Sequence, residues 1–275
     1  MIREYRTICD LSEHSFTATK VQGVTLGELG EVFLPNGDTC ACQVLEVDDD
    51  TVLAAFLQSP MGLDTETCKV RFFGHGVELP LSEDLLGRTW NSLGEPMDGG
   101  SMILPEKYAS INARPINPLA RTCSTKTVQV GDEVPLRLGG KGAISSNPRS
   151  IAKTIAQVAR NAKIQGEDKP FTIVISATGL PFQERQLLTD ELRRRGLTAQ
   201  TALFASNPAD RPILHRRTSR TAMTAAEYFA FERDRHVLFI EADLSGETST
   251  DVEERIGCRK RREGSITMLQ ILAED

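Results

Sequence analysis

The chain has 275 residues, of which 40% are hydrophobic and 25% charged, and this balance excludes an intrinsically disordered protein. Its formal net charge of -6 and aromatic content of 5% argue against a nucleic-acid-binding protein, which needs surplus lysine and arginine to neutralise phosphates. The chain has no apolar run of about eighteen residues, the length needed to span a membrane, and its charged amino terminus lacks the apolar core of a signal peptide. We therefore expect a cytoplasmic protein.

Residues 1–75 contain short apolar and β-branched runs separated by turn signals, of which Asn36-Gly37 is the strongest. Many short strands in so few residues favour a small closed sheet, because closure removes exposed strand edges. We predict an N-terminal β-barrel with no catalytic cluster.

Six cysteines occur without a CxxC pair, and the chain has four histidines, which argues against structural zinc. Cys40 and Cys42 would share one face of a strand, as a soft-metal or redox pair would require. Two reduced thiols on a half-buried strand are the favoured interpretation for a cytosolic protein.

Residues 76–134 form a loop-rich connection, because prolines recur through the segment and a glycine pair lies at 99–100. One short helical element is predicted, with Ser82 as its N-cap and Glu83 and Asp84 in its first turn.

The remainder of the second domain, which spans residues 76–275, changes to alternating helices and strands. Apolar runs predict strands at 171–179, 200–206 and 236–243. Helical periodicity predicts helices from the Asn147 cap and Pro148 onward, over 182–195 up to Gly196, and over 218–234. Helices between apolar strands indicate an α/β domain with a mostly parallel sheet.

Ligands of such sheets bind at the carboxyl ends of the strands, which here are residues 177–179, 205–207 and 241–243.

A glycine-rich stretch, LGGKGAISSNPRSIAK at 138–153, precedes the first of these helices. The phosphate-loop pattern G-x-x-x-x-G-K-[ST] fails from each glycine, because Lys141 stands among the glycines and Pro148-Arg149 stand at the helix start. Weak docking of a nucleotide or another anion remains open, with five candidate contacts: Gly139, Gly140, Lys141, Ser145 and Ser146.

Two carboxylates have alternative interpretations. Asp243, at the end of a predicted strand, is either a magnesium ligand or a turn cap beside Ser245, and the cap is favoured. Glu184 is either a water-positioning carboxylate or a residue that favours the amino end of its own helix, and the second role is favoured. We assign no catalytic residue and no metal site.

Several long stretches resemble the non-catalytic B subunit of the V/A-type rotary ATPases, the V-type ATP synthase beta chain. They begin with MIREYRTI at the first residue. The longest are LSEDLLGRTWNSLGEPMDGG and ILPEKYASINARPINPLAR, within 81–121, and MTAAEYFAFERDRHVLFIEADL at 223–244.

The resemblance implies a β-barrel followed by a RecA-like nucleotide-binding-type domain, in a subunit that alternates with catalytic A subunits in a hetero-oligomeric ring. Such a subunit lacks the phosphate-loop lysine and contributes an arginine across the interface. It implies no required cofactor, with ATP or ADP and magnesium bound, if at all, at a subunit interface. It also implies contact with the membrane only through the complex, in which proton or sodium ions are translocated.

This sequence departs from the family after residues 133 and 244, where expected segments are missing, and the family's C-terminal helical domain does not follow. None of Arg255, Arg259, Arg261 or Arg262 can be assigned the interface role from its position. We expect residues 245–263 to form a polar, mobile surface loop and the strand beyond it to expose apolar surface.

Two functions stay open. One is a non-catalytic B-type subunit of the ring, and the other is a stand-alone degenerate paralogue that binds a nucleotide or a partner. An independent nucleoside triphosphatase ranks last.

Overall fold

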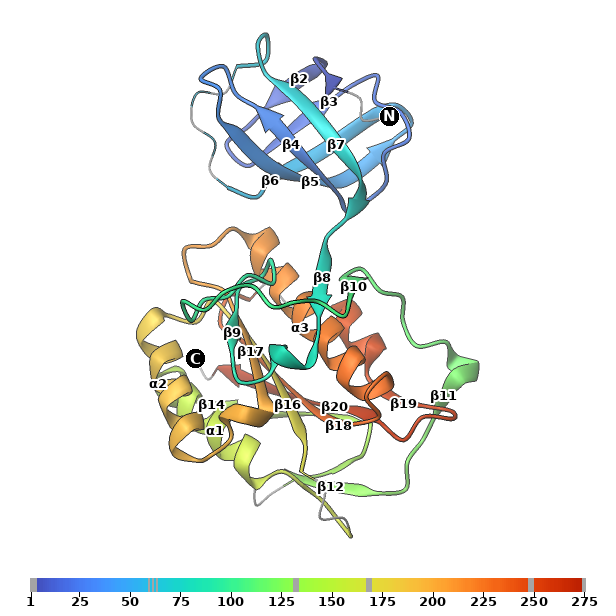
Figure 1. Cartoon of the computed structure of the whole chain (residues 1–275), viewed down its shortest axis with the longest axis vertical. Helices are drawn as coiled ribbons and strands as arrows, with labels where there is room; N and C mark the ends of the chain where they lie inside the picture. The colour runs from blue at the N-terminus through green and yellow to red at the C-terminus, as the bar shows by residue number, and fades with distance from the viewer. Residues whose placement is uncertain are drawn as a thin grey trace. The chain divides into compact units, whose positions relative to one another are not determined.

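The computed structural model describes residues 4–58, 60, 62, 64–130, 134–166, 170–246 and 250–273. Its contacts divide the chain into two compact units, Met1–Glu78 and Leu79–Asp275. The first is built of strands, and the second combines a mixed sheet with helices (Figure 1).

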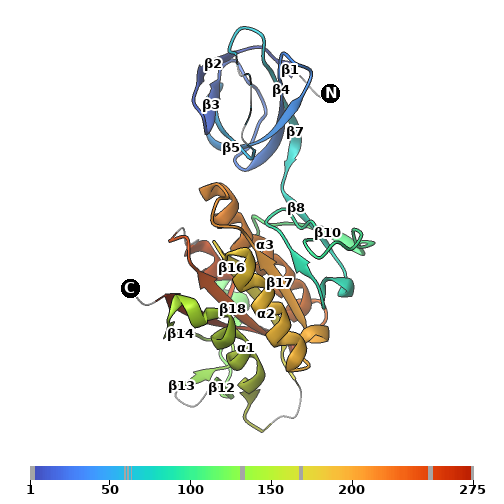
Figure 2. The same ribbon diagram turned by 90° about the vertical axis from the view of Figure 1, so that its left-hand side faces the viewer.

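The first unit is a seven-stranded antiparallel sheet in the order β1-β7-β4-β5-β6-β3-β2, curled into a nearly closed barrel (Figure 2). Its strands are β1 (Glu4–Tyr5), β2 (Ile8–Leu11), β3 (Ser15–Ala18), β4 (Glu28–Phe33), β5 (Thr39–Asp48), β6 (Thr51–Phe56) and β7 (Lys69–Gly76). The predicted N-terminal β-barrel is confirmed.

The barrel core contains Cys40, Cys42 and Cys68 among aliphatic and aromatic side chains. Cys40 and Cys42 both point inward from β5, as their spacing predicts. Burial, and then the neighbouring Cys40 thiol, raise the pKa of Cys42, which keeps this thiol protonated and unreactive. Among the described residues, no group of three or more His, Cys, Asp or Glu is placed to hold a metal ion.

The second unit is organised around an eight-stranded sheet in the order β11-β19-β20-β18-β16-β17-β9, with β14 also paired to β20. Each neighbouring pair in the series β14, β20, β18, β16, β17 and β9 is parallel. The pairs β11–β19 and β19–β20 are antiparallel. Their bounds are β9 (Thr89–Trp90), β11 (Arg121–Thr122), β14 (Lys141–Ser146), β16 (Thr172–Thr178), β17 (Thr201–Ala205), β18 (His236–Asp243), β19 (Gly257–Arg259) and β20 (Ser265–Ala273).

Helices cover both faces of this sheet. The helices α1 (Ile151–Asn161) and α2 (Phe182–Arg194) bury Ile155 and Leu188 against Ile173 and its neighbours. The helix α3 (Pro212–Phe231) covers the other face, where the Ser219 hydroxyl lies 3.1 Å from the Ser176 hydroxyl. The predicted α/β domain with a mostly parallel sheet is confirmed.

Two smaller sheets complete the unit. The strand β8 (Glu78–Leu81) pairs with β10 (Lys107–Ser110), and β12 (Thr127–Val130) lies between β13 (Val134–Arg137) and β15 (Lys163–Ile164).

The sequence predictions hold for most elements, but the predicted start of α3 is wrong. The strand at 236–243 and the helix beginning at Phe182 are confirmed, and Gly196 has the predicted helix-ending role at φ +71°. α3 begins at Pro212, six residues before the predicted start at Thr218. The signal missed was Pro212 itself, whose fixed φ suits the first turn of a helix.

Within the segment at 245–263, residues 251–259 are packed against the rest of the unit. Residues 247–249 lie outside the described residues, but a 3-10 helix follows at Thr250–Arg255 and leads into β19. Val252 and Ile256 are buried, and Arg255 is only 1% exposed. The prediction of a polar surface loop was therefore wrong for this part of the segment. Apolar and charged residues alternate in it, so its burial was not evident from the sequence.

Arg255 connects this segment to α3 through hydrogen bonds. Its guanidinium donates to the Ile111 carbonyl at 3.0 Å, to the Thr224 hydroxyl at 2.9 Å and to the Glu227 carboxylate at 2.7 Å. The strand β20 is buried over its first five residues, from Ser265 to Leu269. The apolar exposure predicted for this strand occurs only at its end, where Leu272 is 52% exposed.

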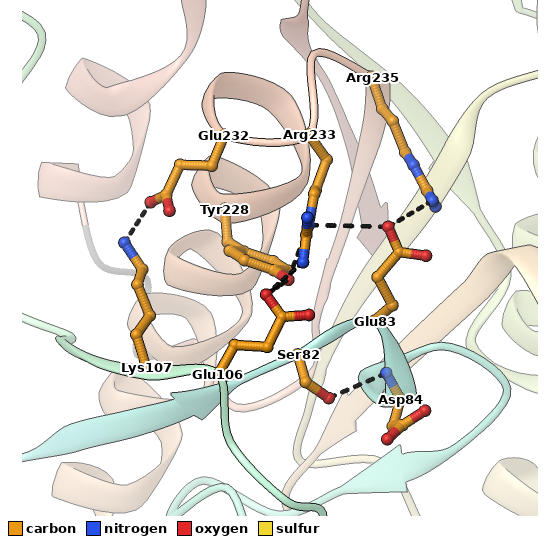
Figure 3. Close-up of polar contacts among 9 residues, drawn as sticks. All are labelled: Ser82, Glu83, Asp84, Glu106, Lys107, Tyr228, Glu232, Arg233 and Arg235. Atoms are coloured by element: carbon orange, nitrogen blue, oxygen red, sulfur yellow. Dashed lines mark hydrogen bonds and ion pairs between the residues drawn. The ribbon is translucent and has the colours of Figure 1, made fainter.

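Ion pairs around the end of α3 hold the loop-rich connection (Figure 3). The predicted N-cap is confirmed, since the Ser82 hydroxyl accepts from the Asp84 amide at 3.0 Å at the start of the 3-10 helix Glu83–Leu85. Arg235 donates to the Glu83 carboxylate at 2.8 Å, and Arg233 donates to the Tyr228 hydroxyl at 2.9 Å. Two further ion pairs complete this network, one between Arg233 and Glu106 and one between Lys107 and Glu232.

We predict that Arg255→Met costs about 3 kcal/mol of unfolding free energy, because it leaves the Glu227 carboxylate buried without its closest charge partner. Urea denaturation measures the loss. Arg262→Met is the matched control, since the Arg262 side chain is 49% exposed and lies 3.7 Å from Asp234, and it should cost less than about 1 kcal/mol. Equal small losses in the two variants would contradict the anchoring role.

Candidate functional site

The glycine-rich stretch at 138–153 does not form one loop. Gly139 and Gly140 lie in a turn, and Lys141–Ser146 forms β14, which pairs in parallel with β20. Lys141 and Ser146 are thus separated by about 16 Å along an extended strand, and only Ser145 and Ser146 reach its carboxyl end. This corrects the predicted loop, because the ladder with β20 takes up the residues expected to be flexible.

The glycines of this stretch have structural reasons of their own. Gly139 has φ +80°, and a Cβ there would approach the Cys258 sulfur to 2.7 Å. A Cβ on Gly142 would approach a Leu136 methyl to 2.5 Å. Tight packing against β19 and β13 explains why glycine occupies both positions, and no phosphate ligand is needed to explain them.

The turn between β14 and α1 occupies the position of a phosphate loop, and Asn147 closes it. The Asn147 side-chain oxygen accepts from the Arg149 amide at 2.9 Å, and its carbonyl accepts from the Ser150 amide at 2.9 Å. The predicted cap is confirmed, although Pro148–Ser150 forms a 3-10 turn before α1 begins. Two amides that an anion would need here are already bonded within the chain.

The two predicted serine contacts differ in exposure. Ser146 is buried, with its hydroxyl 2.8 Å from the Thr154 hydroxyl, whereas Ser145 is exposed. Neither forms a cradle with the distant Gly139 and Gly140.

Lys141 contributes to another part of the molecule. Its ammonium pairs with the Glu253 carboxylate, which belongs to the 3-10 helix that Arg255 anchors. With Gly139 and Gly140 it lines a cavity of about 790 Å³ that also includes Arg121. Lys141 therefore pairs with a carboxylate at the amino end of β14, and it does not lie at the carboxyl edge of the sheet.

Asp243 acts as the centre of a turn at the carboxyl edge. One of its carboxylate oxygens accepts from the Thr178 hydroxyl at 2.6 Å and from the Ser245 amide and hydroxyl at 2.9 and 2.7 Å. These contacts favour the capping role over the magnesium role.

Ser206 and His215 also lie at this edge, and neither was singled out from the sequence. The Ser206 hydroxyl accepts from the Gly179 amide at 3.1 Å and lies 2.8 Å from Nδ1 of His215. Ser206 could have been proposed from the sequence, because it follows the predicted strand that became β17. Nothing in the sequence indicated His215. A further backbone donor at the carboxyl edge is thereby satisfied internally.

Glu184 and Arg185 begin α2 beside that edge. Arg185 donates to the Asn207 side chain at 2.9 Å, and burial lowers its pKa. Glu184 is half-buried, and its Oε2 is shielded from solvent with no hydrogen-bond partner among the described residues. Its location in the first turn matches the helix-start interpretation.

Two buried charged groups lie on the face covered by α3. Burial, and then repulsion from Arg220, lower the pKa of Arg217 to about 10. Burial raises the pKa of Glu241, which accepts a hydrogen bond from Gln270 at 3.1 Å. Both groups are internal, at 2% exposure each, and so do not form an open site.

Three arginines of the 255–262 cluster, Arg255, Arg259 and Arg262, make intramolecular contacts. Arg255 and Arg259 both approach Glu227, and the Arg259 guanidinium lies 4.1 Å from the centre of the Phe231 ring. Arg262 approaches Asp234 at 3.7 Å, and Arg261 adopts φ +63°. The cluster belongs to the packing around the end of α3.

We predict that Glu241→Gln stabilises the protein at pH 7 and has little effect near pH 4. A raised folded-state pKa means that the folded chain retains a proton that the unfolded chain releases, so stability falls as pH rises past the unfolded pKa. Urea denaturation at both pH values measures this difference. Glu263→Gln, at an exposed position, is the control, and equal pH dependence of the two variants would refute the assignment.

We predict that Asp243→Ala destabilises the protein by about 1–3 kcal/mol, because it removes the acceptor of three buried or half-buried donors. Magnesium should leave the melting temperature of the wild type and of Asp243→Asn equally unchanged. A magnesium-dependent rise in the wild type alone would instead assign Asp243 as a ligand.

Residues 132–249 match the model of the ATP synthase alpha/beta family, nucleotide-binding domain. The matched segment runs from β13 through β18 and includes the β14–α1 turn and the carboxyl edge. This part of the second unit is therefore similar to the nucleotide-binding domain of that family. No helix in the described part of the chain is long and apolar enough to cross a membrane.

Proposed function

We propose that this chain is a non-catalytic, B-type-like subunit of a V/A-type ATP synthase or ATPase, and that it contributes to the ring rather than hydrolysing ATP. Its partner in this proposal is the catalytic A-type subunit. The complex would translocate protons or sodium ions, and the chain would be cytoplasmic, reaching the membrane only through that complex.

The closed turn at Asn147 is the observation that carries the proposal. A catalytic subunit needs free amides, a lysine and a following hydroxyl at this turn to hold the phosphates and magnesium. Here the Arg149 and Ser150 amides bond to Asn147, and Lys141, at the amino end of β14, pairs with Glu253.

These residues do not fit a self-contained magnesium–ATP site. Asp243 Oδ1 accepts hydrogen bonds from Thr178 and Ser245, and the Gly179 amide is bonded to Ser206. No cofactor is required for the proposed role. A nucleotide would bind only with groups supplied by a neighbouring subunit, and we derive no catalytic step through it.

Charge supports the same class of partner. A net charge of -6 disfavours a nucleic-acid partner and is compatible with a protein partner. A chain that occupies a ring position needs a partner surface and not a complete active site.

Co-expression with a catalytic A-type subunit tests the proposal. We expect the two chains to elute together from a size-exclusion column, and the isolated chain to show no ATP hydrolysis and no saturable ATP binding with or without magnesium. A chain that elutes alone beside a folded A-type subunit contradicts the ring role. Saturable ATP binding by that solitary chain would support the stand-alone binding module.

Asn147→Gly is an informative companion variant. It releases the Arg149 amide and gives the turn the flexibility of a phosphate loop. A gain of weak inorganic phosphate binding in this variant, measured by calorimetry, would show that Asn147 closes the site. An unchanged absence of binding would mean that other groups keep anions out.

A further inference from the structure

The cavity of about 790 Å³ lies at the amino end of β14, at the edge of the sheet opposite its carboxyl edge. Its lining comes from three segments of the second unit, within residues 115–121, 139–141 and 253–256. A volume of this size is typical of small-molecule sites. The proposed function assigns no ligand to this cavity.

Four charged residues line the cavity, and two of them are paired with each other. The Lys141 ammonium pairs with the Glu253 carboxylate, so these two charges are balanced within the chain. Arg121 and Glu254 are exposed, and neither has an ion-pair partner among the described residues. The cavity therefore has one guanidinium and one carboxylate available to a ligand.

Backbone contacts hold Arg121 beside Glu254. Nη2 of Arg121 donates to the Glu254 carbonyl at 2.8 Å, and the Ile116 amide donates to the same carbonyl at 3.3 Å. Nε and Nη1 of Arg121 have no hydrogen-bond partner in the part of the chain that the structure describes. The guanidinium thus lies within one glutamate side-chain length of a carboxylate with which it forms no ion pair.

The rest of the lining is mostly apolar. Pro115 and Pro118 are exposed, and Ile116 and Ile256 are buried, with 3% and 5% exposure. Prolines and packed isoleucines lose little conformational entropy when a ligand covers them. An apolar group that enters the cavity can therefore be covered without ordering flexible side chains.

We propose that this cavity binds an α-amino acid with an apolar side chain. The Arg121 guanidinium donates hydrogen bonds to the carboxylate of the ligand, and the Glu254 carboxylate accepts them from its ammonium group. The ligand side chain lies against the prolines and isoleucines of the lining, and Lys141 stays paired with Glu253. This inference goes beyond the proposed function and does not rest on it.

Calorimetric titration of the isolated full chain with L-leucine tests the proposal. We expect saturable binding with a dissociation constant of about 1 mM or lower. Glycine, which has no apolar side chain, should bind about tenfold more weakly or worse. L-leucinamide lacks the carboxylate and N-acetyl-L-leucine lacks the ammonium group, and each should also lose about tenfold or more in affinity.

Two variants connect each charge of the ligand with its side chain. Arg121→Gln should weaken leucine binding about tenfold or more and leave leucinamide binding unchanged, because leucinamide lacks the group that Arg121 binds. Glu254→Gln should have the same effect on leucine and none on N-acetyl-L-leucine. Arg114→Gln and Glu46→Gln, at exposed positions outside the cavity lining, are the charge controls and should bind leucine as the wild type does.

A folded wild-type chain that shows no saturable binding of leucine up to about 10 mM overturns the proposal. Equal affinities for leucine and leucinamide also overturn it, since Arg121 would then not hold the carboxylate, and this comparison needs no variant. Equal losses in the charge controls would do the same. The titration omits the A-type subunit, so its failure is separate from failure of the ring role.

Discussion

The guanidinium of Arg255 joins three parts of the second unit that are distant in sequence. It binds a carbonyl of the connecting segment, at Ile111, and the Thr224 and Glu227 side chains of α3. These bonds and the Glu227 charge compensate most of the buried guanidinium, and its Nε has no hydrogen-bond partner among the described residues. The position of the 3-10 helix at 250–255 depends on this contact.

That helix in turn determines the chemistry of its neighbours. It brings Glu253 to Lys141 and to Gln270, whose amide also bonds to Glu241. The Lys141 charge is thus paired with the Glu253 carboxylate. Where we expected a polar surface loop between β18 and β20, polar contacts join the 3-10 helix to β14 and β20.

The carboxyl edge of the sheet is occupied by its own polar groups. Asn147, Ser206 and Asp243 each bond to backbone amides or hydroxyls that an anionic ligand would otherwise use. The sheet and its helices have the architecture of a nucleotide-binding domain, and these three side chains make internal hydrogen bonds at its carboxyl edge.

The sequence by itself determined the elements whose signals are local. The buried strand β16, the strand β18, the end of α2 at Gly196 and the caps Ser82 and Asn147 all follow from apolar runs or side-chain chemistry within a few residues. It also excluded a complete phosphate loop, because that pattern is a matter of spacing alone. Only the tertiary structure decided that residues 141–146 form a strand, that Arg255 is buried and that Lys141 meets Glu253. Each of these depends on a partner more than 25 residues away, and the free energy of a ladder or an ion pair is gained only when folding brings both halves together.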